Sequence, residues 1–242
     1  MLKMIEAILA KRIVTEGVKT TGDRRMRGQL KNMHGKNYIC CGACVNACPV
    51  KAISLVDGVP VIDYKKCIFC GKCVEVCAER VLQHSNKEAL AEILIEAQTE
   101  VKEMVTAKLG RSLHVRHVDA GSCNACDFEM CALSNPIYDL HRYGIAFVAS
   151  PRHADMIMVT GVVTRNLEQA LRMTYDAMPE PRLVMACGAC AAGGETFGST
   201  YAIVGKVADV VPVDIAVPGC PPRPSAMIVA LCAAADLLKE KM

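Results

Sequence analysis

Residues 67–77 read Cys-Ile-Phe-Cys-Gly-Lys-Cys-Val-Glu-Val-Cys, which spaces four cysteines as C-x2-C-x2-C-x3-C. In a two-cluster iron–sulfur protein, the first three thiolates of such a run bind one 4Fe–4S cluster and the fourth binds the other. A second run, Cys41, Cys44 and Cys48, has the same relative spacing and is followed by Pro49. A pair of structural zinc sites is the alternative, but zinc does not need this spacing twice. The two runs therefore predict a small ferredoxin-like domain with two interlocked clusters.

The second run departs from the pattern where it begins. Three residues before Cys41 the chain has Tyr38, and the extra thiol is Cys40. Because thiolates overwhelmingly bind the iron of such clusters, we expect Cys40 to be the missing ligand. A three-iron cluster and a ligand other than cysteine remain the alternatives. The predicted ligand sets are Cys40, Cys41, Cys44 and Cys77 for one cluster, and Cys48, Cys67, Cys70 and Cys73 for the other.

The composition indicates a folded protein that is rich in thiols. Of the 242 residues, 15 are cysteine, 52% are hydrophobic and 22% are charged, which excludes a disordered chain. The formal net charge is only +3, aromatic residues make up 4%, and tryptophan is absent. A nucleic-acid partner is therefore not expected.

The first residues do not have the pattern of a secretory signal. Glu6 interrupts the apolar stretch of MLKMIEAILAKR, and a polar segment follows the pair Arg24–Arg25. No stretch reaches roughly 18 apolar residues, so no transmembrane helix is expected. We therefore expect a cytoplasmic protein, in which thiols stay reduced and clustered cysteines bind metal.

The first two segments of the chain differ in charge and in cysteine content. Residues 1–36 contain nine Lys or Arg and three Asp or Glu, a net charge of +6. This basic extension is either a solvated tail or a docking segment for a partner or a membrane surface. Residues 37–84 are the predicted ferredoxin-like domain. Short strands are expected there at residues 52–56 and 59–63.

Residues 85–112 are predicted to form a linker helix. Ser85 with Glu88 has the pattern of a capping box, and Gly110 suits the end of a helix. Apolar residues recur at helical spacing over 86–109, so one face of this helix is expected to be covered.

Residues 113–242 alternate strands with helices, which predicts a doubly wound, flavodoxin-like parallel sheet in an α/β protein. Ligands of such sheets bind beyond the carboxyl ends of the strands, and most of the remaining cysteines follow predicted strands. The predicted strands are 114–119, 145–150, 156–160, 183–187 and 212–217. The predicted helices are 126–143, 165–178 and 224–240, and Asn135–Pro136 favours a new start within the first.

Three cysteine motifs of this domain identify a family. GSCNACDFEM (121–130), CGACAAGG (187–194) and VPGCPPRP (217–224) resemble the small, cluster-carrying subunit that respiratory complex I shares with membrane-bound nickel–iron hydrogenases. Residues 25–85 separately resemble the two-cluster ferredoxin-like subunit of the same machines. The chain thus resembles a fusion of two neighbouring subunits, most of all those of the formate hydrogenlyase type.

The resemblance implies a third set of ligands. Carried over motif by motif, Cys123, Cys126, Cys190 and Cys220 hold one further 4Fe–4S cluster, so three 4Fe–4S clusters are expected in all. It also implies that Cys187 is a bystander. We interpret Cys131 and Cys232 as small, buried hydrophobic residues.

The resemblance also directs attention to the loop that contains Arg152 and His153, which is expected to lie near this third cluster. A cation there would favour the reduced cluster, and a histidine can couple a proton to the electron. The alternative is a structural salt bridge between Arg152 and Asp155.

Hydrogenases of this family have C-x2-C where complex I has two adjacent cysteines, so Cys123-Asn-Ala-Cys126 favours the hydrogenase branch. The resemblance then implies an electron-transfer subunit without a catalytic centre of its own, on the inner face of the cytoplasmic membrane. Its implied partners are a nickel–iron large subunit, membrane-embedded subunits and a soluble donor such as a formate dehydrogenase, a carbon monoxide dehydrogenase or a ferredoxin. One alternative is a subunit of a complex I-like ferredoxin or NADH:quinone oxidoreductase. Another is a free ferredoxin-like carrier.

Overall fold

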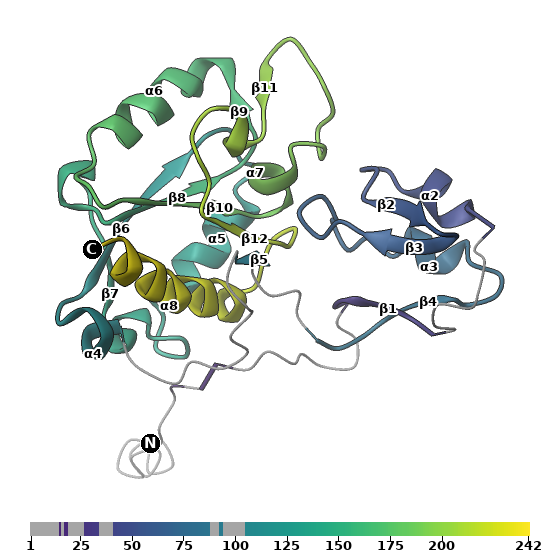
Figure 1. Ribbon diagram of the computed structural model, residues 1–242, viewed down its shortest axis with the longest axis horizontal. Coiled ribbons are helices and arrows are strands. Elements are labelled where there is room, and N and C mark those ends of the chain that lie inside the picture. The colour runs from purple at the N-terminus through teal and green to yellow at the C-terminus, as the bar shows by residue number, and fades with distance from the viewer. Residues whose placement is uncertain (1–14, 16, 19–26, 34–40, 88–91, 94–104) are drawn as a thin grey trace, which may run out of the picture.

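The computed structural model describes residues 15, 17–18, 27–33, 41–87, 92–93 and 105–242 (Figure 1). Most of the predicted basic extension, as well as Tyr38 and Cys40, lies outside the described residues. A small cysteine-rich unit precedes a larger α/β unit built on a parallel sheet. The fold class predicted from the sequence is therefore confirmed.

The sheet of the larger unit has the strand order β5-β12-β10-β8-β6-β7. All neighbours from β7 to β12 run parallel, and β5 pairs antiparallel with β12. Counted along the chain, the parallel strands lie in the flavodoxin-like order 2-1-3-4-5. The strands are β5 (Glu92–Ile93), β6 (Leu113–Asp119), β7 (Ile145–Phe147), β8 (Met156–Thr160), β10 (Leu183–Cys187) and β12 (Ile215–Val217).

Helices cover both faces of this sheet because its strands are apolar on both sides. In β8, Met156 and Met158 belong to one core and Ile157 and Val159 to the other. The first core includes residues of α4 (Val105–Leu109) and α8 (Pro224–Lys241) and packs against α5 (Ala125–Ala132). The second includes residues of α6 (Arg165–Asp176) and α7 (Ala189–Gly193), so α6 and α8 lie on opposite sides of the sheet (Figure 1).

Short elements complete this unit. Strand β9 (Val163–Thr164) pairs antiparallel with β11 (Ile203–Gly205). The 3-10 turns are η2 (Leu140–Tyr143), η3 (Pro151–His153) and η4 (Val207–Asp209).

The predicted helix over 126–143 is not continuous. Helix α5 ends at Ala132, and the chain becomes helical again only in η2. The Asn135 side chain accepts hydrogen bonds from the backbone N–H groups of Ile137 and Tyr138, 2.9 and 3.0 Å away. This Asx turn, together with Pro136, competes with the helix and explains the break.

The smaller unit contains two antiparallel strand pairs and two short helices. Strand β1 (Leu30–Asn32) pairs with β4 (Leu82–His84), and β2 (Ile53–Val56) forms a hairpin with β3 (Val59–Ile62). The helices are α2 (Ala43–Ala47) and α3 (Lys72–Glu75). Its core consists of Leu30, Cys44, Ile53, Cys73 and Leu82, so two of its five buried residues are cysteines.

The predicted linker helix is only partly right. Val105–Leu109 is helical, but Glu92–Ile93 forms strand β5, and residues 88–91 and 94–104 lie outside the described residues. The edge of β12 would otherwise expose unpaired backbone groups, which a short antiparallel strand satisfies. No helix in the described part of the chain is both long and apolar enough to cross a membrane.

Candidate metal centres

Three C-x2-C turns, Cys41–Cys44, Cys70–Cys73 and Cys123–Cys126, share one backbone conformation. In each, the residue after the first cysteine is left-handed, and the second cysteine lies in the first turn of the helix that follows. Glycine adopts this conformation without steric cost, and asparagine tolerates it. The left-handed residues are Gly42 (φ 81°) before α2, Gly71 (φ 83°) before α3 and Asn124 (φ 65°) before α5.

Four thiols of the smaller unit lie close enough to influence one another. Burial, with smaller contributions from the nearby thiols of Cys67, Cys70 and Cys48, raises the pKa of Cys73 to about 11. Burial likewise raises the pKa of Cys67, with smaller contributions from Cys48 and Cys70. These four residues are the set predicted from the spacing to share a cluster.

Backbone N–H groups point at two of the cysteines in matching ways. Ala52 N–H donates to Cys48 Sγ, and Val81 N–H donates to Cys77 Sγ, both at 3.2 Å. In each case the cysteine follows a short helix, and the donor lies four residues further along the chain. Each donor directly follows a residue with positive φ. The two halves of the unit are therefore built alike around Cys48 and Cys77.

The members of the other predicted set are placed differently. Cys44 is buried in the core, Cys77 is partly buried and Cys41 is exposed. Helices α2 and α3, which carry Cys44 and Cys73, are in contact. The fourth predicted member, Cys40, lies outside the described residues.

In the larger unit, the cysteines meet at the carboxyl ends of three strands. Cys123 and Cys126 follow β6, Cys190 lies in α7 after β10, and Cys220 follows β12. Burial raises the pKa of Cys220 to about 11, and Cys190, Cys126, Cys123 and Cys67 add to the increase. Burial also raises the pKa of Cys190, with contributions from Cys126 and Cys123. The structure thus brings together the four cysteines of the third predicted set.

Glycines allow the loops at these strand ends to approach closely. A Cβ atom at Gly188 would lie 2.7 Å from Cys126 Sγ, and one at Gly219 would lie 2.4 Å from Pro222 Cα. Both glycines have positive φ, at 91° and 140°. Only glycine fits here, because a side chain would meet the Cys126 sulfur or the neighbouring backbone.

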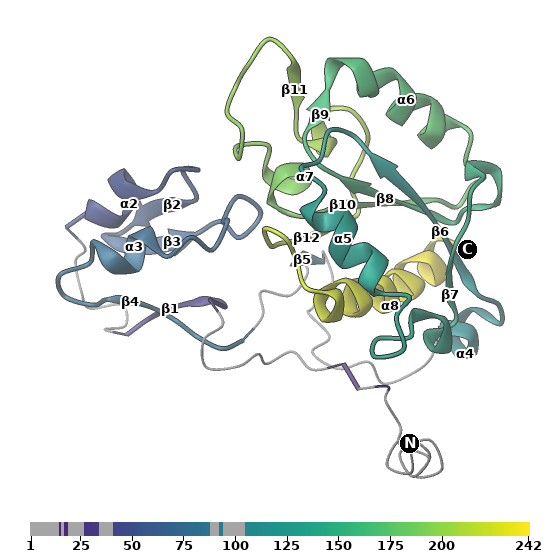
Figure 2. The same cartoon turned by 180° about the vertical axis from the view of Figure 1, so that it is seen from behind.

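The two units meet beside Cys220. The loop between β3 and α3 reaches toward the larger unit (Figures 1 and 2), and Cys67 in this loop lies close enough to affect Cys220. Lys66 Nζ lies 3.5 Å from Glu195 Oε1 across the same contact. The side chains that line a small cavity here include Arg27, Phe69, Cys220 and Arg223.

Comparisons with known proteins match this architecture. Residues 123–234 match the family described as NADH ubiquinone oxidoreductase, 20 Kd subunit, and residues 39–81 match a 4Fe-4S dicluster domain. A probable membrane-bound hydrogenase subunit of Pyrococcus furiosus is 45% identical over 120 residues, which are 50% of this chain and 72% of that protein. The chain belongs to the 20 kDa subunit family.

Other relatives cover different shares of the chain. Formate hydrogenlyase subunit 7 of Escherichia coli is 37% identical over 147 residues, which are 61% of this chain and 58% of that protein. In the solved structure of the membrane-bound sulfane sulfur reductase, an archaeal respiratory membrane complex, one chain is 30% identical with a TM-score of 0.48. That match covers 56% of this chain and 75% of the other.

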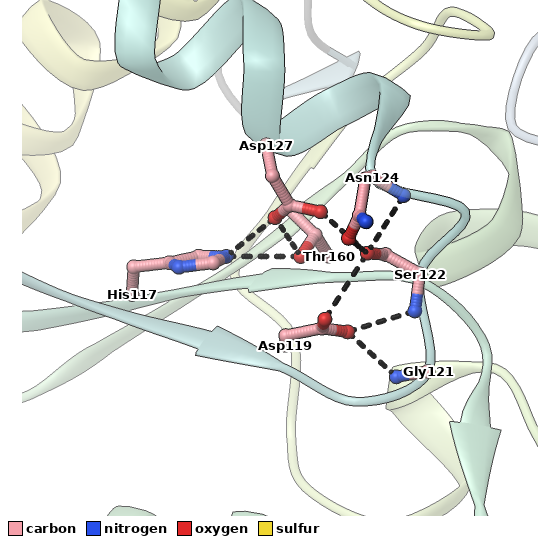
Figure 3. Close-up of polar contacts among 7 residues, drawn as sticks. All are labelled: His117, Asp119, Gly121, Ser122, Asn124, Asp127 and Thr160. Atoms are coloured by element: carbon pink, nitrogen blue, oxygen red, sulfur yellow. Dashed lines mark hydrogen bonds and ion pairs between the residues drawn. The ribbon is translucent and has the colours of Figure 1, made fainter.

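A polar network supports the Cys123–Cys126 turn in this member of the family (Figure 3). Thr160, at the end of β8, donates to Asp127 Oδ1 at 2.8 Å. His117 Nε2 lies 3.0 Å from the same oxygen and 2.9 Å from Thr160 Oγ1. Burial lowers the pKa of His117, and the Asp127 and Asp119 carboxylates oppose that change. Strands β6 and β8 are thereby tied to the helix that carries Cys126.

A second part of the network fixes the turn itself (Figure 3). Asp119 Oδ1 accepts hydrogen bonds from the N–H groups of Gly121 and Ser122, at 2.8 and 2.7 Å. The Ser122 hydroxyl donates to Asp127 and accepts from Asn124 N–H at 3.1 Å. No pattern in the sequence indicates this network, because its members are ordinary polar residues until the sheet brings them together.

The donor set fits an iron–sulfur cluster. The four thiols of the larger unit come from three separate loops, and the Thr196 side chain lies close enough to Cys190 to lower the pKa of that thiol. In that part of the chain, no three His, Cys, Asp or Glu side chains are placed to hold a single metal ion. A 4Fe–4S cluster does not need such a group, because each of its cysteines binds a different iron.

The other cysteines of this unit behave in three ways. Cys232 is buried in the core, as predicted, and burial raises its pKa to about 12. Cys131 is exposed, so its predicted burial is wrong. It lies five residues after Cys126, a rotation of about 140° beyond one full turn, and therefore faces away from the buried side of α5. Cys187 is buried, and the neighbouring Cys126 thiol together with burial raises its pKa.

Arg152 and His153 are not brought to these cysteines, contrary to expectation. Strand β7 ends opposite Val115, about 13 Å of strand length before β6 reaches its cysteine end, and η3 leads directly into the start of β8. The alternative salt bridge is not present either: Asp155 pairs with Arg111 through two contacts of 2.7 Å.

Proposed function

We propose that this chain is the electron-transfer subunit of a membrane-bound nickel–iron hydrogenase complex and that it holds three 4Fe–4S clusters. The observation that carries the proposal is the gathering of Cys123, Cys126, Cys190 and Cys220 beside Cys67, a member of a second four-thiol site. Bound there, each cluster would take up and release one electron. The chain supplies the spacing and the environment.

The proposed ligand sets follow the groups of thiols described above. The larger unit holds one cluster with Cys123, Cys126, Cys190 and Cys220. In the smaller unit, one set is Cys48, Cys67, Cys70 and Cys73, and the other is Cys40, Cys41, Cys44 and Cys77. The domain limits that accompany them are 1–36, 37–84, 85–112 and 113–242.

The contact between the units supports an order for the three sites. Cys67 belongs to the set with Cys48, Cys70 and Cys73, and it is the thiol of the smaller unit that affects Cys220. This set is therefore the inner site of the smaller unit. The set with Cys41, Cys44 and Cys77 is the outer site, at which a soluble donor would deliver electrons.

The partners are proposed from the relatives and from the exposed surface. The relatives in P. furiosus and E. coli are named as subunits of a membrane-bound hydrogenase and of formate hydrogenlyase. Cys123 and Cys220 are exposed, and Phe128 on the adjoining helix α5 is 75% exposed. We propose that a nickel–iron large subunit covers this surface and that membrane-embedded subunits hold the complex on the inner face of the cytoplasmic membrane.

A second function is favoured by one specific observation. The family that matches residues 123–234 is described by a subunit of NADH ubiquinone oxidoreductase. The same chain would then serve a complex I-like quinone oxidoreductase, with the same three clusters and a different large subunit.

Purification of the complex decides between the two functions. The full chain is isolated anaerobically from its native membranes together with its large subunit, and hydrogen evolution from reduced viologen is measured. A large subunit with two C-x2-C pairs, and hydrogen evolution that Cys220→Ser abolishes but Cys131→Ser retains, is the expected result. Quinone reduction without hydrogen evolution would establish the second function instead.

A further inference from the structure

Gly193, the last residue of α7, touches the backbone of the smaller unit. A Cβ atom at Gly193 would lie 2.6 Å from the carbonyl oxygen of Lys65 and 2.9 Å from Lys66 Cα, in the loop between β3 and α3. Ordinary contacts of a Cβ atom are 3.4–4 Å long, and backbone atoms cannot swing aside as the end of a side chain can. A side chain at this position would therefore force the loop away from the helix.

The local backbone does not explain why this residue is glycine. Gly193 is helical and is not among the glycines with positive φ. Alanine stabilises a helix better than glycine does, because glycine loses more conformational entropy on folding. The close approach of the smaller unit is therefore what excludes a side chain here.

The loop cannot move away without carrying Cys67 with it. The carbonyl oxygen of Asp63 accepts hydrogen bonds from the N–H groups of Lys66 and Cys67, at 3.2 and 3.1 Å. The Tyr64 hydroxyl anchors the same loop to β1, where it donates to the carbonyl oxygen of Leu30 at 3.1 Å. A displacement at Lys66 is thus a displacement of Cys67 and of the unit that holds it.

Helix α7 is fixed on the other side of the contact. All five of its residues are buried, and Ala191 and Ala192 belong to the core on that face of the sheet. Cys190 lies three residues before Gly193, which is about one helical turn. The contact therefore joins two firmly held segments, each of which carries a proposed cluster ligand.

We propose that Gly193 is a positioning residue that sets the distance between the inner site of the smaller unit and the cluster site of the larger unit. Its missing side chain lets the loop with Cys67 rest directly on the helix with Cys190. Phe69 of the same loop and Cys220 line one cavity beside this contact. Electron transfer between clusters slows steeply as they move apart, so the contact governs transfer between the units. The inference rests on the proposed ligand sets.

The test compares the full chain with Gly193→Ala and Gly193→Val, purified anaerobically, with iron counted in each sample. On full reduction the clusters are paramagnetic, and electron paramagnetic resonance measures the magnetic interaction between neighbours, which weakens with distance. We expect about 12 iron per chain in all three proteins. The interaction between the units should decrease stepwise from glycine to alanine to valine, and electron transfer after a reducing flash should slow severalfold. The interaction within the smaller unit is the internal reference and should not change.

Glu195→Gln is the control that separates the backbone contact from charge. It removes the ion pair with Lys66, in which Nζ and Oε1 are 3.5 Å apart and both side chains are partly exposed. Such a pair contributes little, so this variant should keep the wild-type interaction. An equal decrease in Glu195→Gln overturns the inference, because charge would then set the spacing.

Two further results would overturn the inference. One is an unchanged magnetic interaction between the units in both Gly193→Ala and Gly193→Val. The other is the loss of about four irons from both variants, because Gly193 would then serve the cluster of the larger unit alone. Wild-type protein with only about eight irons would instead contradict the proposed function.

Discussion

The Cys70–Cys73 turn and the Cys123–Cys126 turn have the same local backbone but are supported in different ways. In the smaller unit, three of the four gathered thiols come from the run 67–73, and the core contains Cys44 and Cys73 themselves. In the larger unit, three separate strand-end loops supply the thiols, and a core on each face of the sheet lies beneath them. The smaller unit is thus built around its cysteines, whereas in the larger unit a sheet with cores of its own positions them.

This difference predicts that iron has unequal importance for folding in the two units. Chelation of all iron under anaerobic conditions should unfold the smaller unit, because its core is small, includes Cys44 and Cys73, and is not sufficient to offset the entropy lost on ordering the chain. The sheet of the larger unit should persist. Hydrogen exchange is the measurement: β2 and β3 should lose protection, whereas β8 and β10 should keep it. An equal loss of protection in both units would show that they depend on iron to the same extent.

Substitution of one proposed ligand in the larger unit should remove the cluster of that unit and leave the other two in place. Cys220→Ser is expected to lower the iron content from about 12 to about 8 per chain, while the smaller unit remains reducible. Cys190→Ser should do the same, and Cys187→Ser should keep all the iron. If Cys187→Ser loses the cluster and Cys190→Ser retains it, the roles of these two cysteines in the α7 loop are reversed.

The smaller unit can be tested at its irregular position. Cys40→Ala should convert one cluster to a three-iron form or remove it, because no thiol then binds the fourth iron. Adding Tyr38→Cys to that variant should restore a four-iron cluster by recreating the regular spacing. Electron paramagnetic resonance distinguishes the two forms. A four-iron signal that persists unchanged in Cys40→Ala would assign the fourth position to another group.

The smallest effect is expected from the polar network of Figure 3. Thr160→Val keeps the side-chain volume but removes the hydroxyl that donates to Asp127, and it leaves a carboxylate oxygen with one partner fewer. The free energy of unfolding of the larger unit should fall by about 1–3 kcal/mol. Denaturant unfolding measures this loss, and Thr174→Val, which removes an exposed hydroxyl from α6, is the control. An equal loss of unfolding free energy in both variants would show that the network does not stabilise the larger unit.

The sequence predicted those parts of the molecule that depend on local pattern. Strands 156–160 and 183–187 were predicted with both ends correct, since their continuous apolar runs mark buried parallel strands. The gathering of Cys48 with Cys67, Cys70 and Cys73 followed from spacing. For Cys190 and Cys220, their position after predicted strands indicated a ligand site, but only the family resemblance selected them as its members, because their approach depends on how three strands are ordered in the sheet.

What the sequence did not reveal depends on contacts between distant segments. Strand β5 forms because the edge of β12 offers hydrogen bonds to it. The close approach of Gly188 to the Cys126 sulfur likewise joins segments that are far apart in the sequence. The misplacement of Arg152 and His153 has the same origin: the loop was identified correctly in the chain, but the register of β7 against β6 determines where it lies.

The most direct test of the account is the iron and acid-labile sulfide content of the intact chain, purified anaerobically. Twelve cysteines in three sets of four predict about 12 iron and about 12 sulfide per chain, with three separate paramagnetic signals on full reduction. About eight iron, or zinc in place of iron at any of the three sites, would contradict it.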